Sequence, residues 1–138
     1  MSERAEFRGK PSWLKKQTYK GAAKAGIAYE RKIGRFLKRR FKKAKVTSGQ
    51  WAVWNGDWYC IDHIVDFEKC AWVVECKLNW KPSAEQKLRN VYGPIVEDVL
   101  EKPVVLVQMC KWPRDCEDFI TLSMVPTSGY CVVHEMGT

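Results

Sequence analysis

The stretch "YCIDHIVDFEKCAWVVECKL", Tyr59–Leu78, decides the fold, and its second half is an apolar run interrupted by two charges. Side chains alternate along a β-strand, so Glu75 and Lys77 share one face of the strand expected over Trp72–Leu78. The other face of that strand is wholly apolar. The charged pair therefore lies on a definite side of a sheet whose opposite side is core.

The first half of the stretch is expected to be a second strand, paired with the first as a hairpin. By strict alternation, the odd-numbered residues of Tyr59–Phe67 form its more apolar side and face the core, and Asp62 lies on the other side. A turn at Glu68-Lys69 then places Asp62 directly opposite Glu75, with the two Cβ atoms about 5 Å apart. A slip of one residue would turn one apolar side away from the core.

Each of these assignments has an alternative. Asp66 lies on the same side of the strand as Asp62, although its place near the turn is typical of a solvated strand end. Glu75 and Lys77 would also be compatible with an exposed cross-strand ion pair on a solvated sheet face. Apolar residues on that face, Val73 and Ile64, argue instead for a covered sheet.

The segment before the hairpin predicts a helix over Tyr19–Lys43, with an apolar stripe that includes Ile27 and Leu37. Glu30 lies on the same stripe, so the helix turns a carboxylate toward whatever it packs on. The alternative is that Glu30 only neutralises Arg31 or Lys32 on a surface helix. After this helix, alternation around the turn signal Asn55-Gly56 predicts two strands that lead into the hairpin.

The segment after the hairpin predicts one more helix and further strands. Ser83 and Gln86 form a capping-box pattern that opens a helix through Leu100, kinked at Gly93-Pro94. "PVVLVQMC" is typical of a buried parallel strand, and "DFITLSMV" and "YCVVHE" predict two more. The element order is αβββαβ with extra C-terminal strands, which indicates a single α/β domain over residues 18–138 behind a basic arm, residues 1–17, that is disordered until it meets a partner.

Composition excludes several classes of protein. The 138 residues are 46% hydrophobic and 29% charged, with no apolar run near the ~18 residues that a membrane span needs. The N-terminus has no secretory pattern, so a cytoplasmic location is the default expectation. The six cysteines form no CxxC pair, which favours reduced, mostly buried thiols over disulfides or a zinc site.

The net charge of +8 is concentrated near the N-terminus. Residues 1–50 hold 16 Lys and Arg against 3 Asp and Glu, whereas residues 51–138 hold 8 against 13. This asymmetry indicates a polyanionic partner such as DNA, because cations placed on phosphates release condensed counterions. A soluble basic tail and a solvated helix end remain the alternatives. The candidate phosphate contacts are Lys15, Lys16, Lys20, Lys38, Arg39, Arg40, Lys42 and Lys43.

The paired carboxylates predict a metal site. Two adjacent carboxylates repel unless one is protonated or a cation neutralises them. Oxygen-only ligands favour Mg²⁺ or Mn²⁺ over zinc. Lys77 would then polarise a water beside the metal, and Glu30 would complete the cluster if its helix packs against the hairpin.

These residues together resemble the active-site signature of the PD-(D/E)XK nuclease superfamily: Asp62, twelve intervening residues, Glu75-x-Lys77, and a helical Glu30 upstream. The expected αβββαβ order is similar to the restriction-endonuclease-like core of that superfamily, over roughly Gly21–Cys110. The segments "GIAYERKIGRFLKRRF", "VTSG", "IDHIV" and "VVECK" look most like small Holliday junction resolvases and related phage endonucleases. The resemblance departs in one position, where Ile61 replaces the proline that names the motif.

The resemblance implies a Mg²⁺-dependent endonuclease that acts as a homodimer on branched DNA. It implies that Glu30, Asp62 and Glu75 bind the metal ions and that Lys77 acts on the attacking water. It also implies accessory roles for Gln86, beside the site, and for Ser48, as a loop serine near the scissile phosphate. Two other functions stay open: a nuclease for linear, nicked or single-stranded DNA, and a non-catalytic basic nucleic-acid-binding protein.

Two further kinds of residue allow both a structural and a functional role. His63 is expected to turn to the core side and to serve as a structural histidine with satisfied hydrogen bonds. The seven tryptophans, several of them in "GQWAVWNGDWY", would either stack on unpaired bases or fill a core or a dimer interface.

Overall fold

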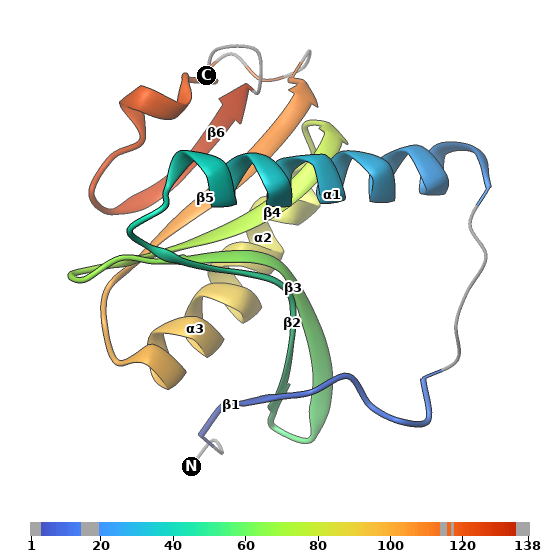
Figure 1. The fold of residues 1–138 in the computed structure, drawn as a ribbon, viewed down its shortest axis with the longest axis vertical. Helices are drawn as coiled ribbons and strands as arrows, with labels where there is room; N and C mark the ends of the chain where they lie inside the picture. Colours follow the sequence, from blue (N-terminus) through green and yellow to red (C-terminus); the bar gives the residue numbers. More distant parts are fainter. Residues whose placement is uncertain (1–3, 15–19, 114–115, 117, 135–138) are drawn as a thin grey trace.

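The computed structural model describes residues 4–14, 20–113, 116 and 118–134, which form an α/β fold around one six-stranded mixed sheet (Figure 1). The spatial order follows the chain: β1 (Glu6–Arg8), β2 (Lys45–Trp54), β3 (Asp57–Asp66), β4 (Ala71–Asn79), β5 (Val104–Trp112) and β6 (Gly129–His134). The first four strands are antiparallel neighbours, and β4, β5 and β6 run parallel.

Helices cover both faces of the sheet. Between β1 and β2 comes α1 (Gly21–Arg40), which crosses one face. Between β4 and β5 the chain runs through α2 (Pro82–Lys87), a π-helical segment (Leu88–Tyr92) and α3 (Gly93–Leu100), which lie on the other face. A short 3₁₀ turn, Leu122–Met124, precedes β6. None of the described helices is long and apolar enough to cross a membrane.

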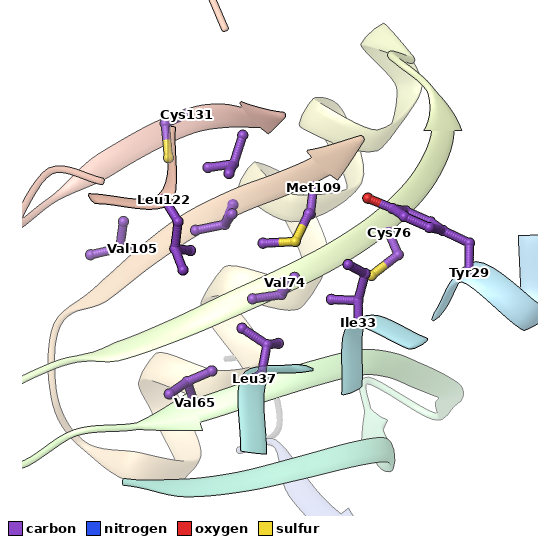
Figure 2. Packing of buried hydrophobic residues seen from close by; sticks show 12 residues of the cluster. Tyr29, Ile33, Leu37, Val65, Val74, Cys76, Val105, Met109, Leu122 and Cys131 are labelled. Atoms are coloured by element: carbon purple, nitrogen blue, oxygen red, sulfur yellow. The ribbon is translucent and has the colours of Figure 1, made fainter. Parts of the chain in front are cut away.

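The face under α1 is one apolar cluster. Ile33 and Leu37, one helical turn apart, are almost fully buried and point toward Val74 of β4 and Val65 of β3 (Figure 2). Met109 of β5 extends the cluster. The 3.6-residue spacing of the apolar side chains is therefore what fixes α1 on the sheet.

The opposite face packs against the helical segment 82–100, which is one continuous, irregular helix as the period predicted. Ile95 and Val96 are fully buried on it. The π-helical segment Leu88–Tyr92 ends two residues before Pro94, whose missing N–H removes a helical hydrogen bond. The predicted capping box is wrong: the helix begins at Pro82, and no side chain caps its first turn.

The register of the β3–β4 hairpin is confirmed. Asp66 pairs with Ala71 and His63 with Val74, and the Phe67 N–H donates to the Cys70 carbonyl over 2.9 Å. These pairs are those expected from a turn at residues 68–69. Apolar residues on both faces of β4 leave no other register that buries them all.

Strict alternation along β3 is wrong, and the break occurs at Asp62. Val65 packs under α1, whereas Ile61 packs on the face of α3 together with Ile64, only three residues away. The β2–β3 pairs pass from Ser48–His63 to Gln50–Ile61, and Gly49 between them has a φ of +63°. Only glycine adopts that φ at little cost, so the β2–β3 hairpin bends at Gly49.

The N-terminal segment differs in part from the expectation of a disordered arm. Glu6–Arg8 form β1, which pairs with Trp51–Val53 at the edge of the sheet. The backbone N–H of Ala5, a buried residue, donates to Asp98 Oδ2 at the end of α3 over 2.6 Å. Residues 5–8 of this segment are therefore ordered by contacts with the rest of the domain.

One predicted C-terminal strand is also wrong. "YCVVHE" is β6 as expected, but in "DFITLSMV" the residues after Ile120 form a 3₁₀ turn. Ile120 makes only an isolated bridge to Val133. Of the six free cysteines, Cys76, Cys110 and Cys131 are buried and the other three are partly buried.

We expect Gly34→Ala to destabilise the protein by about 1–3 kcal/mol, because a Cβ there would lie 2.8 Å from His63 Cε1 and 3.0 Å from Ser48 Oγ. Gly26→Ala is the matched control on the same helix, because a Cβ there would have nothing within 4 Å. This variant should raise the free energy of unfolding by about 0.5–1 kcal/mol. Urea unfolding in EDTA measures both. Equal stability of the two variants would contradict the close packing of α1 on β3.

Candidate metal-binding active site

The site lies where β3 and β4 part. Their last regular pair is His63–Val74, and the next residues along the two strands are Asp62 and Glu75. Asp62 Oδ2 accepts a hydrogen bond from the backbone N–H of Cys76 over 2.9 Å, so this carboxylate fills the gap between the strands. Asp62 and Glu75 therefore stand side by side, as the register predicted.

The four residues predicted to form the site line one cavity of about 510 Å³: Glu30, Asp62, Glu75 and Lys77. The first half of α1 forms the wall facing the strands, with Ala22, Ala23, Gly26 and Ile27. Small residues on α1 leave room for a ligand against the carboxylates. The alternative role of Glu30, as a surface carboxylate paired only with its helical neighbours, does not describe this position.

Burial raises the pKa values of all three carboxylates, and the charge of Asp62 adds to the effect on the two glutamates. Burial, and then the charge of Asp62, raise the pKa of Glu75 to about 8. The same two causes raise the pKa of Glu30 to about 7. Burial also raises the pKa of Asp62, against the opposing effects of the Cys76 N–H and Lys77. The three acids thus share a poorly solvated space in which a cation would be stabilised.

Glu75 is the centre of the cluster and is poorly satisfied. It is only 8% exposed, its Oε1 lies 3.6 Å from Lys77 Nζ, and its Oε2 is buried without a hydrogen-bond partner in the part of the chain that the structure describes. This excludes the alternative of a solvated surface ion pair. A buried, unsatisfied carboxylate oxygen costs free energy unless another group binds it.

The residues fit a divalent cation by their chemistry. Among residues 4–14, 20–113, 116 and 118–134, no three His, Cys, Asp or Glu side chains are already gathered at ligand distances around one point. The fit rests on the oxygen-only donor set, the unpartnered Oε2 of Glu75 and the mutual repulsion of three acids. Glu30, Asp62 and Glu75 are the residues that would hold Mg²⁺ or Mn²⁺ there.

His63 is a structural residue, as predicted. It is 1% exposed, its Nε2–H donates to the backbone carbonyl of Glu30 over 2.8 Å, and its Nδ1 lies 2.9 Å from Ser48 Oγ, whose hydroxyl donates to it. Burial lowers the pKa of His63, which keeps the ring neutral. The imidazole thus ties the turn of α1 that carries Glu30 to β3, next to Asp62.

Asp66, the alternative to Asp62, lies at the other end of the hairpin. Lys102 Nζ contacts its Oδ1 at 2.7 Å and also donates to the Phe67 carbonyl over 2.9 Å. This ion pair fastens the loop after α3 to the hairpin. Asp66 is therefore engaged in the structure and does not line the cavity.

The structure does not place the two accessory residues as the resemblance implied. Ser48 lies within β2, not in a loop, and its hydroxyl is bound to His63. Gln86 is exposed on α2 and does not line the cavity. The helix begins at Pro82 rather than after Ser83, so the face of α2 that meets the site is a different one.

That face carries residues which the sequence analysis missed. A second cavity of about 240 Å³ adjoins Glu75 and Lys77 and is lined by Ser83, Lys87 and Tyr92. Burial, followed by the charge of Glu75, raises the pKa of Tyr92. The i, i+4 spacing of Ser83 and Lys87 is the signal that would have found them, because it places both on one side of the helix.

The basic candidates are separate from the carboxylates. Lys20, at the start of α1, and Lys38, Arg39, Arg40, Lys42 and Lys43, at its end, are exposed. Four of these, Arg39, Arg40, Lys42 and Lys43, line an open pocket of about 500 Å³ beside Phe41 and Phe67. Glu30 and Arg40 are ten residues apart, or about 15 Å along the helix. Lys15 and Lys16 lie outside the described residues.

No protein-family model, curated protein or solved structure was found to match this chain, so the site rests on its own geometry.

Proposed function

We propose that this protein is a metal-dependent endodeoxyribonuclease that hydrolyses DNA phosphodiester bonds and prefers branched DNA such as a four-way junction. One observation carries the proposal: three acids with raised pKa values, from α1, β3 and β4, line one cavity with Lys77. Structural carboxylates normally pair with cations at the surface, whereas Glu75 is buried and Glu30 and Asp62 are half-buried beside it.

The connectivity supports the comparison with the PD-(D/E)XK superfamily. Leaving out β1, the order is α1, three antiparallel strands, the segment 82–100 and a parallel strand, which is similar to the αβββαβ core expected of a restriction-endonuclease-like fold. Asp62 and Glu75 sit at the point where two of these strands separate. Functional residues at such a split are presented to a ligand by rigid strands.

The chain's own residues would perform distinct tasks. Glu30, Asp62 and Glu75 would hold Mg²⁺, which when bound acts as a Lewis acid toward the phosphate and lowers the pKa of a coordinated water. Lys77, 39% exposed and 3.6 Å from Glu75, would orient the attacking water and add positive charge where the phosphorane develops negative charge. His63 and Ser48 would fix α1 on β3 so that Glu30 stays on the cavity.

The cations at the end of α1 would bind the DNA backbone. A pocket that combines four cationic side chains with two phenylalanines fits phosphates and sugars rather than base edges. Such contacts suit an enzyme that recognises the shape of its substrate. We also propose a homodimer, which would place two sites on opposite strands of a junction.

Cleavage assays on matched substrates test the proposal. We expect the purified protein to cut a four-way junction in Mg²⁺ or Mn²⁺ and to be inactive in EDTA, leaving paired, symmetric cuts. Equal cutting of a linear duplex of the same sequence would favour the alternative of a nuclease for linear or nicked DNA. Binding of both substrates without any metal-dependent cleavage would leave only a basic nucleic-acid-binding protein.

A further inference from the structure

Trp51 and Trp58 of the β2–β3 hairpin lie together with Trp13 of the N-terminal segment. The hairpin extends away from the helices of the domain (Figure 1). The ring centroids of Trp13 and Trp58 are 6.3 Å apart, and those of Trp51 and Trp58 are 6.4 Å apart, in edge-to-face contact. Trp13 is 65% exposed. We call these three residues the tryptophan cluster.

Cationic side chains border the tryptophan cluster. The Arg8 guanidinium lies 5.9 Å from the ring centroid of Trp58 and also contacts Glu6 at 3.0 Å. Lys10 is exposed on the same N-terminal segment. An aromatic surface edged with cations favours a ligand that combines flat rings with negative charge, as nucleotides do.

The tryptophan cluster is continuous with the carboxylates. Trp51 pairs with Cys60 across the β2–β3 ladder, and Cys60 is two residues from Asp62. Cys60 therefore lies between Trp51 and the carboxylates. Trp58 and Asp62 are four residues apart, or about 13 Å along an extended strand.

We propose that the tryptophan cluster binds unpaired DNA bases by stacking, close to the phosphodiester held at the carboxylates. The role in cleavage rests on the nuclease function proposed above, whereas the binding does not. At the duplex rise of ~3.4 Å per strand, a distance of about 13 Å spans at most about four nucleotides, and fewer on a more extended open strand. Bases within a duplex are already stacked on their neighbours, so exposed indole rings select strands that are open. The substrate is then branched DNA that has unpaired bases beside the cut.

A purely structural role would be to hold the N-terminal segment on the hairpin. That segment has other anchors: β1 pairs with β2, and the Ala5 N–H binds Asp98. Trp13 itself is mostly exposed, so its removal deletes little buried area. The two roles therefore predict different results for Trp13→Ala.

The test is fluorescence anisotropy with a labelled single-stranded oligonucleotide and a blunt duplex of the same sequence, both in EDTA. We expect Trp13→Ala and Trp58→Ala to weaken single-strand binding at least about fivefold each and duplex binding less than about twofold. Phe119→Ala, which removes a 47% exposed aromatic ring from another surface, should change neither.

Single-strand affinity within twofold of wild type in Trp13→Ala, at unchanged thermal stability, would overturn the proposal, whatever Trp58→Ala does. The readout contains no metal and no cleavage, so it also separates this proposal from the nuclease. Loss of single-strand binding in a protein that never cleaves DNA would support the cluster and refute the nuclease. Cleavage of open DNA, with normal single-strand binding by both tryptophan variants, would support the nuclease and refute the stacking role of the tryptophan cluster.

Discussion

Glu75→Gln should reduce Mg²⁺-dependent cleavage by at least about 10³-fold while leaving DNA binding in EDTA within about twofold of wild type. The amide keeps the size of the side chain but loses the charge that holds the cation. Glu75 is also the acid whose Oε2 has no partner among the described residues, so nothing else is expected to replace its contribution. Single-turnover cleavage of a labelled junction, at saturating enzyme, measures the chemical step separately from binding.

Lys77→Ala is expected to lower the same rate constant by about 10²–10³-fold, because it removes positive charge beside the phosphate without removing a metal ligand. Higher Mg²⁺ should not restore it. Glu97→Gln, at an exposed position of α3, and Lys69→Ala, at the exposed turn of the same hairpin, make the same changes of charge away from the site and should retain full activity. If either site variant cuts as fast as these controls, the proposed nuclease site is wrong.

The register of the hairpin could be predicted from the sequence because both faces of β4 are apolar for most of its length. Val73 and Val74 point to opposite cores and each is fully buried, so any odd slip would expose a buried side chain on one face or the other. Asp62 and Glu75 then had to be neighbours. The pairing of Asp66 with Ala71 confirms this reasoning.

The bend of the β2–β3 hairpin at Asp62 could not be predicted from alternation. A period of two assumes an unbroken pleat, and the pleat breaks where Gly49 takes a φ of +63°. A glycine within a strand pattern is a recognised signal for such a break. "VTSGQW" contained that signal, but alternation on its other residues favoured a regular strand.

The accessory residues were placed by analogy, and the structure shows why this was unsafe. Gln86 was expected beside the site only from the resemblance, as a polar residue near the start of the second helix. With Lys81 in place of Ser83 as the residue before the first turn, the helix begins two residues earlier, at Pro82, and Ser83 and Lys87 line the cavity beside Glu75. Successive residues of a helix are about 100° apart around its axis, so Gln86 and Lys87 point in different directions.

The first segment was misjudged for a different reason. Composition predicted a disordered arm, because scattered charge and a single Pro, Pro11, carry no period. Its three-residue strand is too short to show one, and it forms on the edge that β2 offers. Contacts between distant segments of this kind are not visible in local patterns.

The metal-free protein should lose stability as the pH rises from about 5.5 to 8.5. Glu75 and Glu30 have pKa values raised to about 8 and about 7, so the folded state holds more protons than the unfolded state in that range. Stability from these groups is complete below the unfolded pKa of about 4.5 and is lost as the pH passes the folded values. The expected difference is on the order of 3 kcal/mol, measured by urea unfolding in EDTA.

Glu75→Gln isolates this effect, because an amide cannot titrate. At pH 4.5 the variant and the wild type should be nearly equal in stability, and at pH 8.5 the metal-free variant should be the more stable protein. Glu68→Gln should follow the wild type at both values, since this carboxylate is exposed. Parallel curves for the variant and the wild type would show that the carboxylates are solvated and do not repel one another.

Mn²⁺ should reverse the effect in the wild type alone. A cation among Glu30, Asp62 and Glu75 favours their ionised forms, so its binding releases protons and stabilises the folded state most at high pH. Addition of Mn²⁺ at pH 8.5 should therefore raise the unfolding midpoint of the wild type and leave that of Glu75→Gln almost unchanged. Glu75→Gln is thus expected both to abolish cleavage and to stabilise the metal-free fold. This combination is expected of a site whose carboxylates repel one another until a cation binds.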